Sequence, residues 1–134
     1  VLAKRGGILQ RLYWPFMLGL GGPIGKGAQM MSWIHLNDMV RAIVFLMEHP
    51  SAAGIFNFTA PNPVSNNRFC QQLGQQLQRP AVFRMPEPMA RLAFGEMADL
   101  LLFGQKVVPQ RLQELGYHFQ YPDLTGALAA IYSR

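Results

Sequence analysis

Five glycines lie within the nine residues from Gly19 to Gly27, and this spacing constrains the fold more than any other feature of the chain. Glycine adopts positive φ angles without a steric penalty and lets the backbone come close to a neighbouring group. The segment therefore predicts a loop that can approach a ligand closely. Four side chains suited to recognition follow in an apolar, extended stretch: Gln29, Ser32, Trp33 and His35.

Two nucleotide-binding motifs can be tested on this loop. A P-loop needs Gly at position 20 and Ser or Thr at position 27, where this chain has Leu20 and Gly27. The dinucleotide fingerprint G-x-G-x-x-G fails as well, because its last glycine is replaced by Ile24 in one frame and by Met30 in the other. By these tests the loop is not a phosphate cradle.

The residues after the loop predict a strand and then a helix. Residues 30–36 form the strand, whose side chains alternate between two faces. Asn37 is a suitable N-cap for a helix that runs to Glu48, and Asp38 in its first turn complements the helix dipole. Few residues of this helix are charged, so most of its circumference needs to be covered.

The composition points to a piece of a larger protein. Only 14% of the 134 residues are charged and 50% are hydrophobic, whereas an average soluble domain has roughly 25% charged residues. We interpret the chain as a fragment whose missing part covers apolar surface; a sparsely charged domain or an oligomer with a large interface is the alternative. In isolation, we expect exposed apolar area on the helix over residues 38–48, which favours association.

The rest of the chain predicts one α/β domain. Residues 55–59 and 81–85 have strand composition, and the helix between them has Ser65 or Asn66 as its N-cap and ends at Arg79-Pro80. This order predicts a β-α-β unit with parallel strands. The other predicted elements are a strand end at Val1-Leu2, a helix over residues 8–18, a helical stretch from Pro88 to Phe103 interrupted at Gly95, a short helix from Pro109 to Gly116 with Leu112 and Leu115 inward, a strand over residues 117–121, and a last helix capped by Asp123 with Leu124, Leu128 and Ile131 on one side.

Charge and cysteine content argue against several classes of function. The formal net charge is +5, but the 12 Lys and Arg residues are spread along the chain, so the sequence predicts no nucleic-acid partner. The single cysteine, Cys70, cannot form an internal disulfide, which fits a reducing cytoplasm. No stretch reaches the roughly 20 apolar residues of a membrane span. His49 and His118 are isolated from acids at ligand spacing, so no metal site is predicted.

Two pairs of polar residues have the side-chain types of catalytic groups. Ser32 and His35 suggest a nucleophile and its base, yet they fall on opposite faces of a regular strand and no acid stands behind the imidazole. A histidine that joins strand to helix by bonding its own backbone neighbours or Asp38 is the preferred interpretation. Glu96 and Asp99 share a helix face and are interpreted as a solvated pair. The sequence therefore predicts no catalytic residue.

One further pattern runs through nearly all of the chain. It consists of Gly19-Leu20-Gly21-Gly22-x-x-Gly25-x-Gly27-x-Gln29-x-x-Ser32-Trp33-Ile34-His35-x-x-Asp38, Phe56-Asn57-x-x-Ala60-Pro61-x-Pro63-Val64, Arg79-Pro80, Gly95-Glu96, Gly104-Gln105-x-Val107-x-Pro109 and Gly116-Tyr117-x-Phe119-x-Tyr121-Pro122. This series resembles the C-terminal part of epimerase-family proteins (NAD-dependent epimerase/dehydratase-like) in the extended short-chain dehydrogenase/reductase superfamily. Such proteins carry a C-terminal domain of uncharacterised function.

The resemblance implies a complete protein that binds NAD(P) on an N-terminal Rossmann domain and uses a Tyr-x-x-x-Lys pair for proton transfer. No tyrosine here is followed four residues later by lysine. On this interpretation, residues 1–60 hold late Rossmann elements with the substrate-side loop, strand and helix, and residues 61–134 are the C-terminal epimerase-family segment. The implied fold is the substrate-side portion of a Rossmann-like α/β protein, with a β-α-β unit and several helices.

The implied function is substrate binding within an NAD(P)-dependent oxidoreductase or nucleotide-sugar-epimerase-like protein, with this piece inactive alone. Its implied partners are the missing N-terminal Rossmann half and a small-molecule substrate, and homo-oligomerisation is left open. In such relatives the segment equivalent to residues 25–38 borders the substrate. The candidate substrate contacts are therefore Gln29, Ser32, Trp33 and His35. The alternative is a non-catalytic dinucleotide-sensing or protein-interaction module on the same fold.

Overall fold

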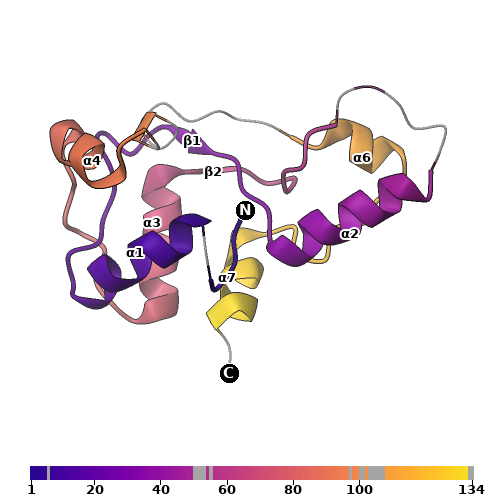
Figure 1. Cartoon of the computed structure of the whole chain (residues 1–134). Coiled ribbons are helices and arrows are strands. Elements are labelled where there is room, and N and C mark those ends of the chain that lie inside the picture. The colour runs from indigo at the N-terminus through magenta and orange to yellow at the C-terminus, as the bar shows by residue number, and fades with distance from the viewer. Residues whose placement is uncertain are drawn as a thin grey trace.

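The computed structural model describes residues 1–5, 7–49, 54, 56–96, 98–99, 102 and 108–132. Two groups of helices can be seen in Figure 1: α1, α3 and α7 lie below the two short strands, while α2 and α6 lie together on the right. The elements in chain order are α1 (Gly7–Met17), β1 (Met30–Met31), α2 (Leu36–Met47), β2 (Val64–Ser65), α3 (Asn66–Leu77), α4 (Glu87–Phe94), α6 (Gln110–Glu114) and α7 (Leu124–Tyr132).

The larger hydrophobic core lies where α1, α3 and α7 meet. Each helix turns one apolar face inward at the spacing that the sequence predicted. Pro15 lies inside α1, which continues through it to Met17. The helix residues that are buried in this core include Leu9, Leu12 and Phe16 of α1, Phe69 and Leu73 of α3, and Leu124, Leu128 and Ile131 of α7.

Strand pairing differs from the prediction. In the sheet that the structure describes, β1 and β2 are antiparallel, with Met30 opposite Ser65 and Met31 opposite Val64. The predicted strand over residues 30–36 is thus reduced to two residues. Residues 56–59 form no strand, and residue 55 lies outside the described part. The predicted β-α-β unit from residues 55–59 and 81–85 is therefore wrong.

Residues 81–85 lie beside the glycine-rich loop instead. Ile24 and Met85 form a parallel bridge. The Met85 N–H donates to the Pro23 carbonyl at 2.8 Å, and the Gly25 N–H donates to the Met85 carbonyl at 2.8 Å. The predicted strand over residues 81–85 is thus reduced to one bridge residue, Met85, and its partner is the loop, which local sequence patterns do not reveal.

A second parallel bridge attaches the first residues of the chain to the start of α2. Leu2 bridges His35; its N–H donates to the Ile34 carbonyl at 2.7 Å, and its carbonyl accepts from the Leu36 N–H at 2.9 Å. Leu2 is 2% exposed. The predicted strand end at Val1-Leu2 is confirmed by these bonds.

A smaller core joins α2 to α6 and the segment that follows it. Ala42, Leu112 and Tyr117 are its buried members. Gly116, with φ 97°, follows the C-cap of α6, as predicted from its sequence. Leu112 points inward as predicted, whereas Leu115 is exposed. Residues 117–121 form no strand, contrary to the prediction, because their polar groups bond to a side chain of α2.

The predicted start of α3 and the predicted end of the next helix, α4, are confirmed. Ser65 is the N-cap of α3 and accepts from the Arg68 N–H at 3.2 Å. The α4 helix ends at Gly95, which confirms the predicted interruption. Most of the predicted continuation to Phe103, and the Gly104-Gln105-x-Val107 motif, lie outside the described residues.

The helix α2 has one buried face and one exposed apolar face. Its N-cap is His35 and not Asn37, and its buried residues are Asp38 and Ala42. Val40 and Val44 are about half exposed. The described residues therefore do not cover this helix all round, and the predicted exposed apolar area on it is confirmed.

Candidate functional site

The glycine-rich loop is packed closely against its own protein. A Cβ atom added at Gly21 would lie 2.5 Å from the Phe16 ring, and one added at Gly22 would collide with the backbone carbonyl of Phe83. The predicted close approach to the glycines is thus an approach by α1 and by residues 81–85. The space above Gly21 and Gly22 that a phosphate cradle would need is filled by these groups.

Two asparagines at the start of α3 fix the rest of the loop. Asn66, only 2% exposed, accepts from the Ile24 N–H at 2.7 Å and donates its own N–H to the Gln29 carbonyl at 2.8 Å. The Asn67 N–H donates to the Gly27 carbonyl at 2.8 Å, and the Asn67 side chain fills the space where a Cβ of Gly27 would stand. The position of Gln29 is therefore set from α3.

The four candidate substrate contacts lie in one continuous segment from the loop to α2, but their accessibility differs. Gln29 and Ser32 are half-buried, and the Gln29 amide donates to the Ile24 carbonyl at 3.0 Å. Trp33 is 3% exposed and belongs to the larger core, and its indole N–H donates to the Asn62 carbonyl at 2.9 Å. Gln29 and Ser32 are thus the members with surface to offer a ligand.

His35 caps α2. Its Nδ1 accepts from the Asn37 N–H at 3.0 Å, and its ring stacks on Tyr121 with 4.2 Å between centroids. This confirms the interpretation that the histidine joins strand and helix through its backbone neighbours. Because the lone pair of Nδ1 is used by the cap, that nitrogen is not available as a base for Ser32.

Stability should depend on the protonation of His35. Burial lowers its pKa, and the nearby Asp38 carboxylate raises the pKa by a smaller amount. The unfolded chain therefore binds more protons than the folded one as the pH falls through about 6.5. We expect the free energy of unfolding, measured in urea by circular dichroism, to be lower at pH 5.5 than at pH 7.5.

A variant separates this effect from other titrations. His35→Asn keeps an N-cap acceptor that does not titrate, so it should reduce the difference between the two pH values. His118→Asn, at an exposed histidine, should leave the difference unchanged. An undiminished pH dependence in His35→Asn would exclude His35 as its source.

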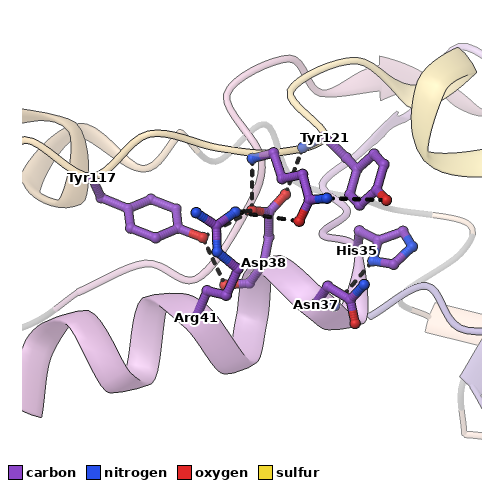
Figure 2. A network of polar contacts seen from close by, with 7 residues as sticks. His35, Asn37, Asp38, Arg41, Tyr117 and Tyr121 are labelled. Atoms are coloured by element: carbon purple, nitrogen blue, oxygen red, sulfur yellow. Dashed lines mark hydrogen bonds and ion pairs between the residues drawn. The ribbon is translucent and has the colours of Figure 1, made fainter. Parts of the chain in front are cut away.

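A buried carboxylate lies next to this segment. Asp38 is 0% exposed, and it accepts from the Tyr117 hydroxyl at 2.8 Å and from the Gln120 and Tyr121 N–H groups at 2.9 Å each. Arg41 is 3.7 Å from the same carboxylate. Burial, and then the bond to Asp38, raise the pKa of Tyr117. Figure 2 shows these groups converging on the first turn of α2.

This arrangement, called the Asp38 anchor below, holds residues 117–121 against α2 and places Tyr121 on His35 (Figure 2). The sequence indicated a role for Asp38 at the helix dipole or as a partner of His35, and it gave no sign of the bonds from Tyr117 and Tyr121. The partners lie 79 to 83 residues away. The aromatic and polar alternation of residues 117–121 predicted a strand, and no local signal identifies a shared buried acceptor.

Three further features of the described part of the chain concern possible metal ligands, a surface acid and the single cysteine. No three His, Cys, Asp or Glu side chains converge there as a metal-binding group. Asp99 pairs with Arg91 at 2.9 Å on the surface, in agreement with a solvated acid. Cys70 is buried, which raises its pKa to about 12, so it is a protonated thiol. None of the described helices combines the length and apolarity needed to cross a bilayer.

Known proteins match most of this chain. Residues 85–131 match the family model described as a domain of unknown function, DUF1731. Over 131 residues the chain is 44% identical to an Arabidopsis thaliana protein named epimerase family protein SDR39U1 homolog, chloroplastic, covering 98% of this chain and 38% of that protein. Over 129 residues it is 43% identical to epimerase family protein SDR39U1 of Mus musculus, covering 96% of this chain and 44% of that protein.

Solved structures match as well. The crystal structure of human epimerase family protein SDR39U1 (isoform 2) with NADPH has a TM-score of 0.91 and 38% identity, over 97% of this chain and 44% of that one. The nucleoside-diphosphate sugar epimerase of Corynebacterium glutamicum has a TM-score of 0.71 and 28% identity, over 97% of this chain and 24% of that one.

The match is nearly complete for this chain and partial for its relatives. The chain spans about two fifths of the length of the curated relatives above, 38% and 44%. The family resemblance predicted from the spaced motifs is confirmed. The chain therefore corresponds to the C-terminal portion of an SDR39U1-like epimerase family protein and contains the DUF1731 domain.

Proposed function

We propose that this chain is the substrate-binding portion of an NAD(P)-dependent oxidoreductase or nucleotide-sugar-epimerase-like protein. The observation that carries the proposal is the human relative with NADPH, which matches 97% of this chain while more than half of that protein lies outside the match. The cofactor is assigned to the unmatched part, because this chain has no dinucleotide fingerprint and no Tyr-x-x-x-Lys pair.

The glycine-rich loop does not fit a dinucleotide. Phe16, Phe83 and Asn67 occupy the space above three of its glycines. From the family resemblance we infer a division in which residues 1–60 supply late Rossmann elements with the substrate-side loop, strand and helix. Residues 61–134 are then the C-terminal epimerase-family segment, and the larger core is shared by both.

We assign the substrate to the segment that contains Gln29, Ser32, Trp33 and His35. Gln29 and Ser32 present partly accessible side chains, while Trp33 and His35 hold the backbone through the core and the α2 cap. Lys26 is exposed, and the guanidinium of the exposed Arg84 donates to the Gly25 carbonyl. Two cations at the loop that precedes Gln29 favour an anionic ligand such as a nucleoside-diphosphate sugar.

The test uses a hybrid protein, in which the N-terminal portion of the human relative is joined to this chain. We expect the hybrid protein, saturated with NADPH, to bind UDP-glucose in a calorimetric titration. Gln29→Ala should weaken that binding by about tenfold, since each lost hydrogen bond to a charged group contributes roughly 1.5 kcal/mol. Gln75→Ala, at an exposed glutamine of α3, is the matched control and should bind as the wild type does.

NADPH titrations show whether each protein is competent. The 134-residue chain alone should bind neither NADPH nor NADH. Dinucleotide binding by the chain alone would place the cofactor site here and contradict the proposal. A hybrid protein that binds NADPH but no nucleoside-diphosphate sugar would reject the substrate assignment and favour the dinucleotide-sensing alternative.

A further inference from the structure

A second exposed apolar surface lies at the C-terminal end of α1. It is distinct from the exposed face of α2, and it includes the end of α1 and part of the segment between α3 and α4. Both segments lie on the left of Figure 1, whereas α2 and α6 lie on the right. This surface, called the apolar end below, consists of Trp14 (66% exposed), Leu18 (69%), Leu20 (53%), Val82 (83%) and Phe83 (46%).

Backbone hydrogen bonds hold the two leucines of the apolar end in their exposed positions. The Leu18 N–H donates to the Trp14 carbonyl at 2.9 Å, and the Leu20 N–H donates to the Pro15 carbonyl at 2.9 Å. Gly19 between the leucines has φ 79°. The bond from Leu20 and the left-handed glycine form a Schellman motif, which ends the helix. The leucines are therefore presented outward by an ordered helix end.

The segment after α3 is attached to both sides of this helix end. The Phe83 N–H donates to the Gly21 carbonyl at 3.1 Å. The Nε of Arg79 donates to the Met17 carbonyl at 3.1 Å. Because these two bonds flank the leucines of the helix end, the apolar side chains of the two segments form one continuous surface.

The charges on this side of the molecule have one sign. All 7 Asp and Glu residues of the chain lie within residues 38–48 or 87–123. Residues 1–37 and 49–86, which contain α1, the glycine-rich loop and α3, have Lys and Arg but no acid. The cations are spread along the sequence, but the fold places these acid-free segments together around the larger core. The apolar end therefore lies on a cationic part of the molecule.

Three arginines lie next to the apolar end. Arg11 is exposed and precedes Trp14 by one helix turn, so the two share a face of α1. Arg79 and Arg84 are exposed and flank residues 80–83. Among the described residues, no carboxylate forms an ion pair with any of these three arginines. Their charges are available to an anionic partner.

A hollow adjoins the apolar end. It has a volume of about 480 Å³ and lies between α3 and the segment that follows it, with Arg79 and Val82 among its lining residues. Its other polar lining residues are Gln71, Gln75 and Gln78. Guanidinium and amide groups donate hydrogen bonds, and no acid lines the hollow. The hollow suits an anionic group that is joined to an apolar one.

This combination is typical of a surface that binds a membrane from one side. Peripheral contacts combine Trp, Phe and Leu side chains with Lys and Arg, and they need no spanning helix. Tryptophan favours the level of the lipid headgroups, and anionic headgroups attract cations. A second copy is a weaker occupant, because two-fold pairing would bring unpaired arginines together. Nucleic acid is weaker as well, because the aliphatic side chains of Leu18, Leu20 and Val82 provide no stacking platform.

We propose that the apolar end binds the surface of a membrane that contains anionic lipids. Trp14, Leu18 and Leu20 enter the boundary between headgroups and acyl chains, and the neighbouring arginines contact the lipid phosphates. This inference goes beyond the proposed function and does not rest on it, because it requires neither NADPH nor a nucleoside-diphosphate sugar.

Vesicle flotation tests the proposal. The 134-residue chain and the hybrid protein are each mixed with vesicles of phosphatidylcholine alone or of phosphatidylcholine with phosphatidylserine. Both proteins should float with the anionic vesicles and not with the neutral ones, and binding should weaken as the salt concentration rises. Trp14 reports the contact itself, because Trp33 is buried. Lipids with a doxyl label should quench the tryptophan fluorescence of the wild-type chain but not that of Trp14→Phe.

Two pairs of variants separate the apolar and the cationic contributions. Leu18→Ser combined with Leu20→Ser should weaken binding of the chain by about tenfold or more, because the burial of two leucines is lost. Val40→Ser combined with Val44→Ser, at half-exposed valines of α2, is the matched control and should bind as the wild type does. Arg11→Gln should weaken binding by about fivefold. Arg68→Gln, at an exposed arginine in the first turn of α3, should weaken it by less than about twofold.

Several outcomes would overturn the proposal. These are no binding to anionic vesicles, equal binding to neutral and anionic vesicles, or an equal loss of binding in the leucine and valine double variants. Quenching that persists in Trp14→Phe would place the contact elsewhere. Binding by the chain but not by a hybrid protein that binds NADPH would show that the missing portion covers the apolar end. Binding of single-stranded RNA without binding of vesicles would identify a nucleic-acid surface instead.

Discussion

Asp38→Asn should lower the free energy of unfolding by about 3 kcal/mol. The wild-type carboxylate accepts three hydrogen bonds from Tyr117, Gln120 and Tyr121 in a fully buried position. The asparagine side chain carries no negative charge, and its NH2 group replaces one of the two carboxylate oxygens. That group is a donor and would face a donor of residues 117–121 instead of accepting from it. Urea denaturation followed by circular dichroism at pH 7.5 measures the change.

A matched control is available on the surface. Asp99→Asn removes a carboxylate that pairs with Arg91, and the Asp99 side chain is 66% exposed. Exposed pairs contribute little, so the loss should stay below about 1 kcal/mol. Tyr117→Phe, which removes one of the three donors to Asp38, should fall between the two. Equal losses in Asp38→Asn and Asp99→Asn would show that the Asp38 anchor does not stabilise the fold.

Gly22→Ala should destabilise the protein by about 3 kcal/mol. The added Cβ would collide with the backbone of Phe83, which is held by the N–H bond from Phe83 to the Gly21 carbonyl at 3.1 Å. A backbone group cannot rotate away as a flexible side chain can. The loop and residues 81–85 would have to separate, and the thermal midpoint should fall accordingly.

Gly126→Ala is the control for this substitution. It makes the same chemical change inside α7, where a new Cβ meets no atom within 4 Å. Alanine is favoured over glycine in a helix by up to about 1 kcal/mol, so this variant should be slightly more stable than the wild type. If Gly22→Ala were as stable as Gly126→Ala, the close packing of the loop would be disproved.

Features determined by neighbouring residues could be predicted from the sequence. The Ser65 cap, the left-handed Gly116 and the inward face of α7 depend on groups a few positions apart. The same is true of His35, whose bond to the Asn37 N–H spans two residues.

Features determined by distant residues were not predicted. The partner of residues 81–85 is the glycine-rich loop, and that choice depends on the whole core. The sequence of Trp33 and its neighbours is compatible with an exposed recognition residue or with a core residue, and in the structure Trp33 is buried in the larger core, with its indole N–H bonded to the Asn62 carbonyl. The Asp38 anchor joins residues about 80 positions apart, so a single sequence contains no sign of it.

The Asp38 anchor also crosses the boundary of the DUF1731 match. The three hydrogen-bond donors to the carboxylate, Tyr117, Gln120 and Tyr121, lie within residues 85–131, whereas Asp38 itself is on α2, well before that region. The unit that the DUF1731 family model defines is therefore smaller than the unit that these hydrogen bonds hold together. Recombination that exchanged residues 85–131 between two proteins would carry the donors without their acceptor. The two segments should accordingly be inherited together, and substitutions at Asp38 and Tyr117 should compensate one another.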